Sequence, residues 1–139
     1  MTVRDYAASR DFYSKVLAPL GYAVKKEFPH VCGFGAGKPD FWIKQGEPAT
    51  QAMHIAFKAA DRKLVDAFHS AALAAGAKDD GAPGVRVIYH PNYYGAFVID
   101  PLNGHPIEAC CHLPPGGAAK VPAKKKSAAK AKPKPKKRR

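Results

Sequence analysis

The beginning of the chain carries a helical hydrophobic pattern followed by several short apolar runs. Tyr13, Leu17 and Leu20 recur at the spacing of one helix face. Asp5 is a residue type that caps helices and Pro19 is typical of a helix end, so a helix is predicted between them. Three short strands, separated by Pro, Gly and His, are then predicted at residues 22–28, 31–34 and 40–44.

The same order of elements begins again near the middle of the chain. Residues 53–58 alternate between apolar and polar side chains, as a half-buried strand does. Asp61 and Gly76 then bracket a second helix with one apolar face. Three more strands are predicted at residues 85–89, 93–99 and 105–111. With the apolar start at residues 1–3 as a strand, the order is strand, helix and three strands, twice.

Charge separates the end of the chain from the rest. Lys120 to Arg139 holds eleven Lys and Arg and no acid, so the chain's 23 basic and 11 acidic residues leave 12 and 11 for residues 1–119. We expect a domain at residues 1–115 and a disordered tail rich in Lys, Ala and Pro at residues 116–139.

A tail of this composition predicts weak, non-specific binding to nucleic acid, because dense positive charge attracts phosphates. The alternative is that the tail is a solubilising extension. The candidate contacts are Lys124, Lys125, Lys126, Lys136, Lys137, Arg138 and Arg139.

Cysteine content and hydropathy indicate the compartment. An odd number of cysteines, Cys32, Cys110 and Cys111, does not suggest a disulfide framework and fits reduced thiols in a cytosol. No stretch is long and apolar enough to span a membrane, so no membrane partner is expected. The sequence therefore predicts a cytoplasmic protein.

The segment at residues 100–108, DPLNGHPIE, is the most informative chemically. A turn opens onto an apolar strand that Glu108 interrupts. A carboxylate inside a buried strand is costly unless a positive or hydrogen-bonding group meets it. His54, in an earlier strand, is the natural partner.

Three segments together resemble the glyoxalase/bleomycin-resistance/extradiol-dioxygenase superfamily, also called the vicinal oxygen chelate superfamily. They are residues 5–13 (DYAASRDFY), 54–57 (HIAF) and 100–108 (DPLNGHPIE), in the order that the family shows. The resemblance implies an α+β fold of two βαβββ modules, about residues 1–46 and 52–113. The two modules would form an open, mixed-sheet, barrel-like cleft.

Active members of this family bind a divalent metal such as Zn, Ni, Mn or Fe in the cleft. By matching position, the resemblance implies that His54 and Glu108 are metal ligands and that Glu108 is also the catalytic residue. It further implies a homodimer. Laying the first module over the second, however, puts the counterpart of His54 upstream of Met1, and that of Glu108 at Phe41 or up to two residues beyond it.

Two protein ligands are fewer than the three of a typical catalytic zinc site. Three interpretations of the His54–Glu108 pair therefore stay open. The pair holds a metal with help from His90, His105 or a second subunit; it is a metal-free acid–base or ligand-binding pair; or it is a structural hydrogen bond. A related hypothesis is that the true start lies a few codons upstream of Met1 and adds a histidine, which an intact mass beginning at Met1 would contradict.

Aromatic residues and one more histidine complete the predicted ligand site. Phe41 and Trp42 lie in a strand expected to border the cleft, one facing it and the other facing the helices. His90 and Tyr94 are expected to line its mouth, whereas Tyr93 is interpreted as an ordinary strand aromatic. Two further residues have alternative interpretations: Arg86 is able to recognise an anionic substrate by a bidentate contact, and Cys110 is able to line the cleft. We interpret Arg86 as a solvated strand residue and Cys110 as a small buried hydrophobe.

Three functions remain open from the sequence. The first is a small-molecule protein of glyoxalase type, including a metal-dependent lyase or isomerase or a dioxygenase-like enzyme. The second is a metal-free protein that sequesters a ligand, like bleomycin-resistance proteins. The third is a nucleic-acid-associated accessory protein that acts through its tail.

Overall fold

A computed structural model of the protein describes residues 1–117. The tail prediction, with its nucleic-acid contacts from Lys124 to Arg139, lies outside the described residues and stays a prediction. Within residues 1–117, no helix has both the length and the apolar character needed to cross a bilayer.

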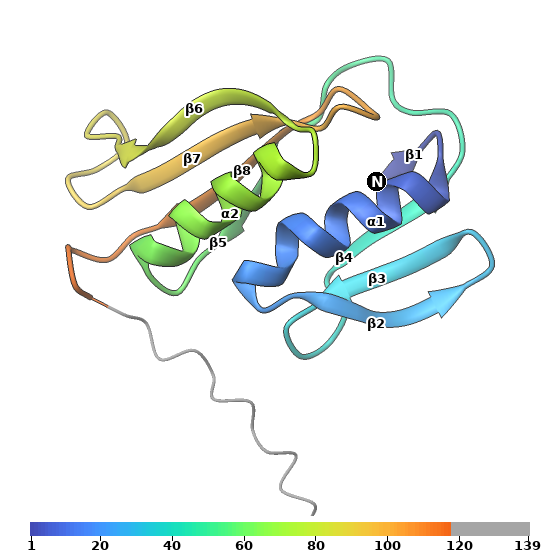
Figure 1. The fold of residues 1–139 in the computed structure, drawn as a ribbon, viewed down its shortest axis with the longest axis horizontal. Helices are drawn as coiled ribbons and strands as arrows, with labels where there is room; N and C mark the ends of the chain where they lie inside the picture. Colours follow the sequence, from blue (N-terminus) through green and yellow to red (C-terminus); the bar gives the residue numbers. More distant parts are fainter. Residues whose placement is uncertain (118–139) are drawn as a thin grey trace, which may run out of the picture.

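The first module contains an α-helix beside a four-stranded mixed sheet (Figure 1). Its sheet order is β1-β4-β3-β2, in which β1 runs parallel to β4 and the other pairs are antiparallel. The elements are β1 (Thr2–Val3), α1 (Tyr6–Leu17), a short 3-10 turn (Ala18–Leu20), β2 (Ala23–Phe28), β3 (Val31–Gly35) and β4 (Phe41–Gln45).

The second module repeats this plan. Its sheet order is β5-β8-β7-β6, with β5 parallel to β8. The elements are β5 (Ile55–Lys58), α2 (Arg62–Ala74), β6 (Lys78–Val85), β7 (Tyr94–Ile99) and β8 (Pro106–Cys111). The predicted α+β fold of two βαβββ modules is therefore confirmed.

Both helices begin at the residues that the sequence indicates. The Asp5 carboxylate accepts a hydrogen bond of 3.0 Å from the Ala8 amide, and the Asp61 carboxylate accepts one of 2.8 Å from the Leu64 amide. Each bond satisfies one of the amides that the first helical turn leaves without a partner. The equivalent capping of α1 and α2 is the local basis of the repeat.

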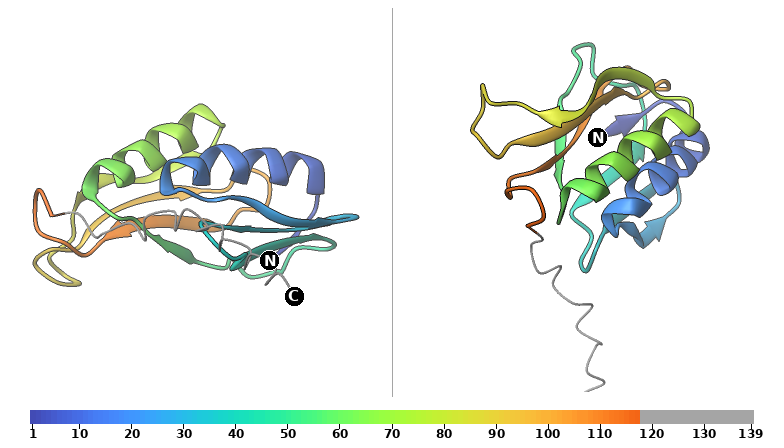
Figure 2. Two further views of the ribbon diagram at one scale, coloured as in Figure 1. Left: turned by 90° about the horizontal axis from the view of Figure 1, so that it is seen from below. Right: turned by 60° about the vertical axis from the view of Figure 1, so that its left-hand side comes forward.

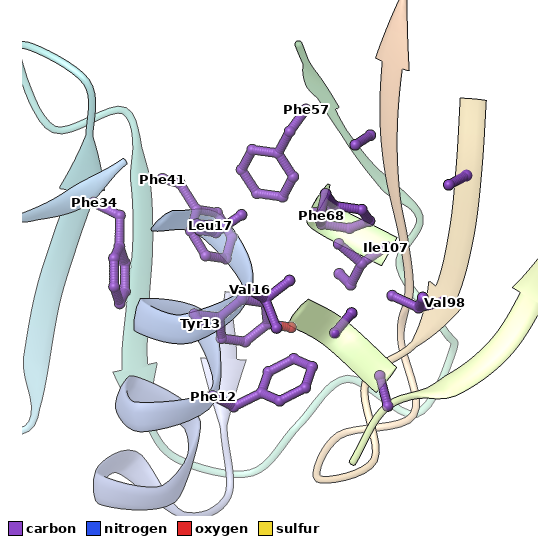
Figure 3. Packing of buried hydrophobic residues seen from close by; sticks show 14 of the residues in the cluster. Phe12, Tyr13, Val16, Leu17, Phe34, Phe41, Phe57, Phe68, Val98 and Ile107 are labelled. Atoms are coloured by element: carbon purple, nitrogen blue, oxygen red, sulfur yellow. The ribbon is translucent and has the colours of Figure 1, made fainter. Parts of the chain in front are cut away.

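The helices cover one face of the sheets and pack against each other (Figure 2). The core lies between the helices and the sheets, and aromatic rings cross the boundary between the modules (Figure 3). The Phe41 and Phe57 ring centroids are 5.1 Å apart, edge to face, and Tyr13 packs on Phe41 at 5.2 Å. The other face of each sheet carries no helix, and we call it the open face. It is the face that a ligand can approach.

A buried polar network also joins the modules. The Tyr13 hydroxyl donates a hydrogen bond of 2.6 Å to Asp100, and both side chains are fully buried. The backbone amides of Leu102 and Asn103 donate to the other Asp100 oxygen. Helix α1 of the first module thus fixes the turn that precedes β8.

The strand predicted at residues 85–89 is wrong. The chain leaves β6 at Val85, and the apolar residues after it form an exposed loop in which Val87 is 75% and Ile88 is 84% exposed. The observed strand Lys78–Val85 is rich in Gly and Asp and contains Pro83. It is an edge strand paired only with β7, where an unpaired proline and two register irregularities are tolerated.

Candidate functional site

The candidate site lies on the open face of the second sheet. Glu108 is in the middle of β8, which runs between β5 and β7. Its neighbours Ile107 and Ala109 belong to the core on the helix side, so the Glu108 side chain points the other way. It is only 4% exposed, and a carboxylate at that depth requires partners.

Two side chains meet the two Glu108 oxygens. His54 Nε2 lies 2.7 Å from Oε2, and the Tyr93 hydroxyl donates to Oε1. His54 comes directly before β5, the parallel neighbour of β8, and Tyr93 directly before β7, its antiparallel neighbour. The sequence pairs His54 with Glu108 but gives no sign of Tyr93 as a partner.

A glycine makes room for this arrangement. A Cβ atom on Gly95 would stand 3.1 Å from the Tyr93 ring and 3.5 Å from Glu108 Oε1. The first contact is tighter than side chains normally accept, so a larger residue would press on the ring that reaches the carboxylate. Gly95 therefore supports the position of Tyr93.

A second polar group lies on the same face beside the first. His90 Nε2 and His112 Nδ1 are 2.8 Å apart, and His112 Nε2 is 3.7 Å from Cys110 Sγ. The Tyr93 ring packs edge-on against both imidazoles, at 5.4 and 5.2 Å. The two ring nitrogens of His112 thus have different partners, and the three donors do not converge on one point.

Burial raises the pKa of the Cys110 thiol to about 11, and the negative charge of Glu108 adds to this effect. Cys110 is therefore a neutral thiol at ordinary pH. All three cysteines are free and buried, as expected for a protein without a disulfide framework.

The predicted aromatic residues divide between the two faces. Phe41, at 7% exposed, is a core residue between sheet and helices, while its neighbour Trp42 lies on the open face of the first sheet. Tyr94 also points to the helix side, where its hydroxyl donates to Asp66 on α2. Strand alternation thus places Trp42 and Tyr93 on the open face and Phe41 and Tyr94 on the helix side, and the ligand-binding role of these residues stays a prediction.

The first module has no carboxylate at the position equivalent to Glu108. When the modules are aligned on their helix caps and strand registers, Trp42 stands at the Glu108 position. The position of His54 falls before Met1. The residues present do not fit a complete metal site, because in the described part of the chain no three His, Cys, Asp or Glu side chains lie around one point.

The arrangement can nevertheless hold and move protons. His54 can give or take a proton at Nε2, and its side chain is 50% exposed, so a ligand can reach the imidazole. Glu108 can accept a hydrogen bond from a ligand hydroxyl or amine if His54 turns aside. An acid–base pair of this type serves both binding and proton transfer.

A scan of protein-family models finds no match to this chain, and a search of the curated proteins finds none either. Solved structures do match. A glyoxalase/bleomycin resistance protein from Albidiferax ferrireducens T118 is 28% identical, with a TM-score of 0.71 over 80% of this chain and 94% of that chain.

Two further structures share the fold at lower identity. A glyoxalase/bleomycin resistance protein/dioxygenase family enzyme from Burkholderia phytofirmans PsJN is 23% identical, with a TM-score of 0.64 over 81% of this chain and 94% of that one. The fosfomycin resistance protein FosX from Listeria monocytogenes, in a complex with Mn(II), is 17% identical, with a TM-score of 0.59 over 78% and 82%.

Proposed function

Because the chain belongs to the glyoxalase/bleomycin-resistance/extradiol-dioxygenase superfamily, we propose that it binds a small molecule on the open face of its second sheet, without a metal. The observation that carries this proposal is Glu108, a nearly buried carboxylate held between His54 and Tyr93. A buried acid with partners from two neighbouring strands is costly to maintain for stability alone, because apolar residues would pack there without it.

The ligand would present a hydrogen-bond donor to Glu108 and replace His54 as a partner of Oε2. Because His54 precedes β5 and is half exposed, its ring can move without disturbing a strand. Tyr93 remains on Oε1 and keeps the carboxylate in place. After it leaves Oε2, His54 lies beside the ligand, and the imidazole can exchange a proton with the ligand.

The test compares the full-length protein with Glu108→Gln and with a matched control, Glu27→Gln. Glu27 is a carboxylate of the first module that pairs with Arg10 and Tyr6, away from the site. Thermal shifts are measured over a set of small hydroxyl- and amine-bearing compounds. We expect compounds that raise the Tm of the wild type and of Glu27→Gln to leave Glu108→Gln unchanged; equal shifts in all three proteins would contradict the proposal.

A second candidate is a divalent metal centre of a glyoxalase-type lyase. The observation in its favour is that His54 and Glu108, a nitrogen and a carboxylate ligand, already lie 2.7 Å apart. The FosX complex with Mn(II) shows that a protein with this fold holds such an ion. The remaining ligands would have to come from water or from the second copy of a homodimer.

Calorimetry with Zn²⁺, Ni²⁺, Mn²⁺ and Fe²⁺ separates the two candidates. The metal-free proposal expects any weak binding to be equal in the wild type, His54→Ala and Glu108→Gln. Tight binding that both substitutions abolish would establish the metal centre instead. Sedimentation of the full-length protein with and without metal would show whether a second copy takes part.

A further inference from the structure

Arg86 is held in place on the open face beside the Glu108 site. Its Nη2 donates a hydrogen bond of 2.7 Å to the Ala82 carbonyl, and its Cζ lies 5.5 Å from the centroid of the Phe97 ring. A guanidinium stacked on an aromatic ring and bonded to the backbone loses much of its conformational freedom. The side chain is thus ordered although it is only partly buried.

The unusual composition of β6 provides the space for this side chain. A Cβ atom on Gly84 would lie 2.8 Å from Arg86 Nη1, and one on Gly81 would lie 3.3 Å from Nη2. Register irregularities in the pairing of β6 with β7 fall between Asp79 and Gly81 and between Gly81 and Gly84. Such bulges commonly re-aim a side chain beside a functional site. The glycines that weaken the strand signal of β6 therefore accommodate Arg86.

Strand register connects Arg86 to Glu108. Gly81 pairs with Phe97, and Phe97 pairs with Glu108, so these three residues form one row across the sheet. The row spans two strand spacings, roughly 10 Å. At the base of the loop, the Arg86 amide donates to the Tyr93 carbonyl at 2.7 Å, which places Arg86 opposite the residue that holds Glu108.

No carboxylate of the described residues forms an ion pair with Arg86; the four ion pairs there involve other cations. An ordered guanidinium with free N–H donors is suited to a carboxylate or phosphate, which it can bind with two parallel hydrogen bonds. The Phe97 ring between Arg86 and Glu108 offers an apolar surface for the middle of a molecule.

From this row we infer that Arg86 is the anion-binding residue of the site. The ligand class is a small molecule that carries a carboxylate or phosphate at one end, an apolar or planar middle and a hydrogen-bond donor at the other end. The anion contacts Arg86, the middle lies on Phe97, and the donor reaches Glu108. This inference rests on the proposed function and adds the chemical class of its ligand.

The test uses the isotope-labelled full-length chain and three probes, benzoate, phenyl phosphate and the neutral benzyl alcohol. Affinity is measured from the shifts of the backbone amides of Phe97 and Glu108. We expect an anionic probe to bind more tightly than benzyl alcohol, and Arg86→Ala to weaken it about tenfold or more, because a charge-assisted bidentate contact is lost. Arg86→Lys, which keeps the charge without the planar fork, should fall between the two.

Arg4→Ala is the matched control, because it removes the same charge from an exposed position in the first module. The basic tail is present in every variant, so its attraction for anions cancels. Unchanged anion affinity in Arg86→Ala, or no amide shift with any anionic probe at millimolar concentration, would overturn the inference. If Glu108→Gln weakens benzyl alcohol, the probe that carries a hydroxyl donor, while Arg86→Ala weakens no anionic probe, only the Arg86 assignment fails. If neither substitution changes any probe, the proposed function fails with it.

Discussion

The two modules have the same topology, but the residues on their open faces differ in chemical character. In the first, Trp42 pairs with Gly33 across β4 and β3; in the second, Glu108 pairs with Phe97 across β8 and β7. A Cβ atom on Gly33 would lie 2.7 Å from the Trp42 ring, so the indole rests directly on the neighbouring strand. The position that holds a carboxylate in one module is thus covered by an aromatic ring in the other.

Carboxylates show the same division. In the first module, Glu27 is tied to Arg10 and Tyr6 of α1, where it joins helix to sheet. In the second module, Glu108 lies on the face without helices and joins no helix. In the first module this carboxylate therefore joins helix to sheet, whereas in the second module the carboxylate lies on the open face, where a ligand can reach its partner His54.

The largest expected effect tests whether the helix sides are equivalent. The module alignment makes Phe41 the counterpart of Ile107, and both are core residues. Phe41→Ala should lower the free energy of unfolding by about 3–5 kcal/mol and Ile107→Ala by about 2–5 kcal/mol, because each leaves a cavity. Chemical denaturation of the full-length protein measures both values.

Trp42→Ala is the comparison for this experiment, since Trp42 is next to Phe41 but lies on the open face and is partly exposed. It should destabilise the protein less than Phe41→Ala does. A larger cost for Trp42→Ala would mean that the open face of the first module is part of the core.

The fold followed from the sequence because its signals are local. Asp5 and Asp61 mark both helix starts, and strands with one buried face reveal themselves by alternation. Edge strand β6 has no such face, so its Gly and Pro residues give no strand signal, whereas the apolar loop after it has the composition of a strand. Packing and hydrogen bonding across the sheet, not propensity, hold residues 78–85 in place.

The site was only partly predictable, for a different reason. Pairing His54 with Glu108 needed only the parallel neighbourhood of first and last strands, which the superfamily resemblance supplied. To choose Tyr93 over Tyr94, one must know which residues of β7 face the core. Ala96 and Val98 are core residues, and Tyr94, at even spacing from both, faces the same side. For Arg86, the residue type allows either anion recognition or a solvated strand residue, and the sequence does not decide between them because its place depends on two glycines and a ring from another strand.

A smaller effect tests how closely Trp42 covers the first module. Gly33→Ala should lower the free energy of unfolding by about 1–3 kcal/mol, because the new methyl group displaces the indole and Pro39. In a Trp42→Ala background the same substitution should cost less, since one of the two contacts is gone. Denaturation of the two single variants and the double variant measures this coupling.

Gly37→Ala is the control for this cycle, because nothing lies within 4 Å of a Cβ atom at Gly37. It should change the stability by no more than about 0.5 kcal/mol. Strict additivity of Gly33→Ala and Trp42→Ala would show that the indole does not rest on Gly33, and the contrast between the open faces would then be weaker.

The smallest effect concerns the charge of the second open face. Burial and the Glu108 carboxylate raise the pKa of Cys110 to about 11, against an ordinary thiol value of about 8.5. Because the folded pKa is raised, this thiol contributes stability that is complete below pH about 8.5 and is lost as pH rises through the folded value. Glu108→Gln removes the negative charge, so the Cys110 pKa should fall.

Alkylation of Cys110 by iodoacetamide, followed by peptide mass spectrometry as a function of pH, measures this change. The midpoint should lie at lower pH in Glu108→Gln, with a rate several-fold higher at pH about 9, because more thiolate is present. Cys32, whose pKa is also raised by burial but which lies in the other module, should react equally in both proteins. Equal profiles for Cys110 would show that the Glu108 charge does not act on this thiol and that burial accounts for its raised pKa.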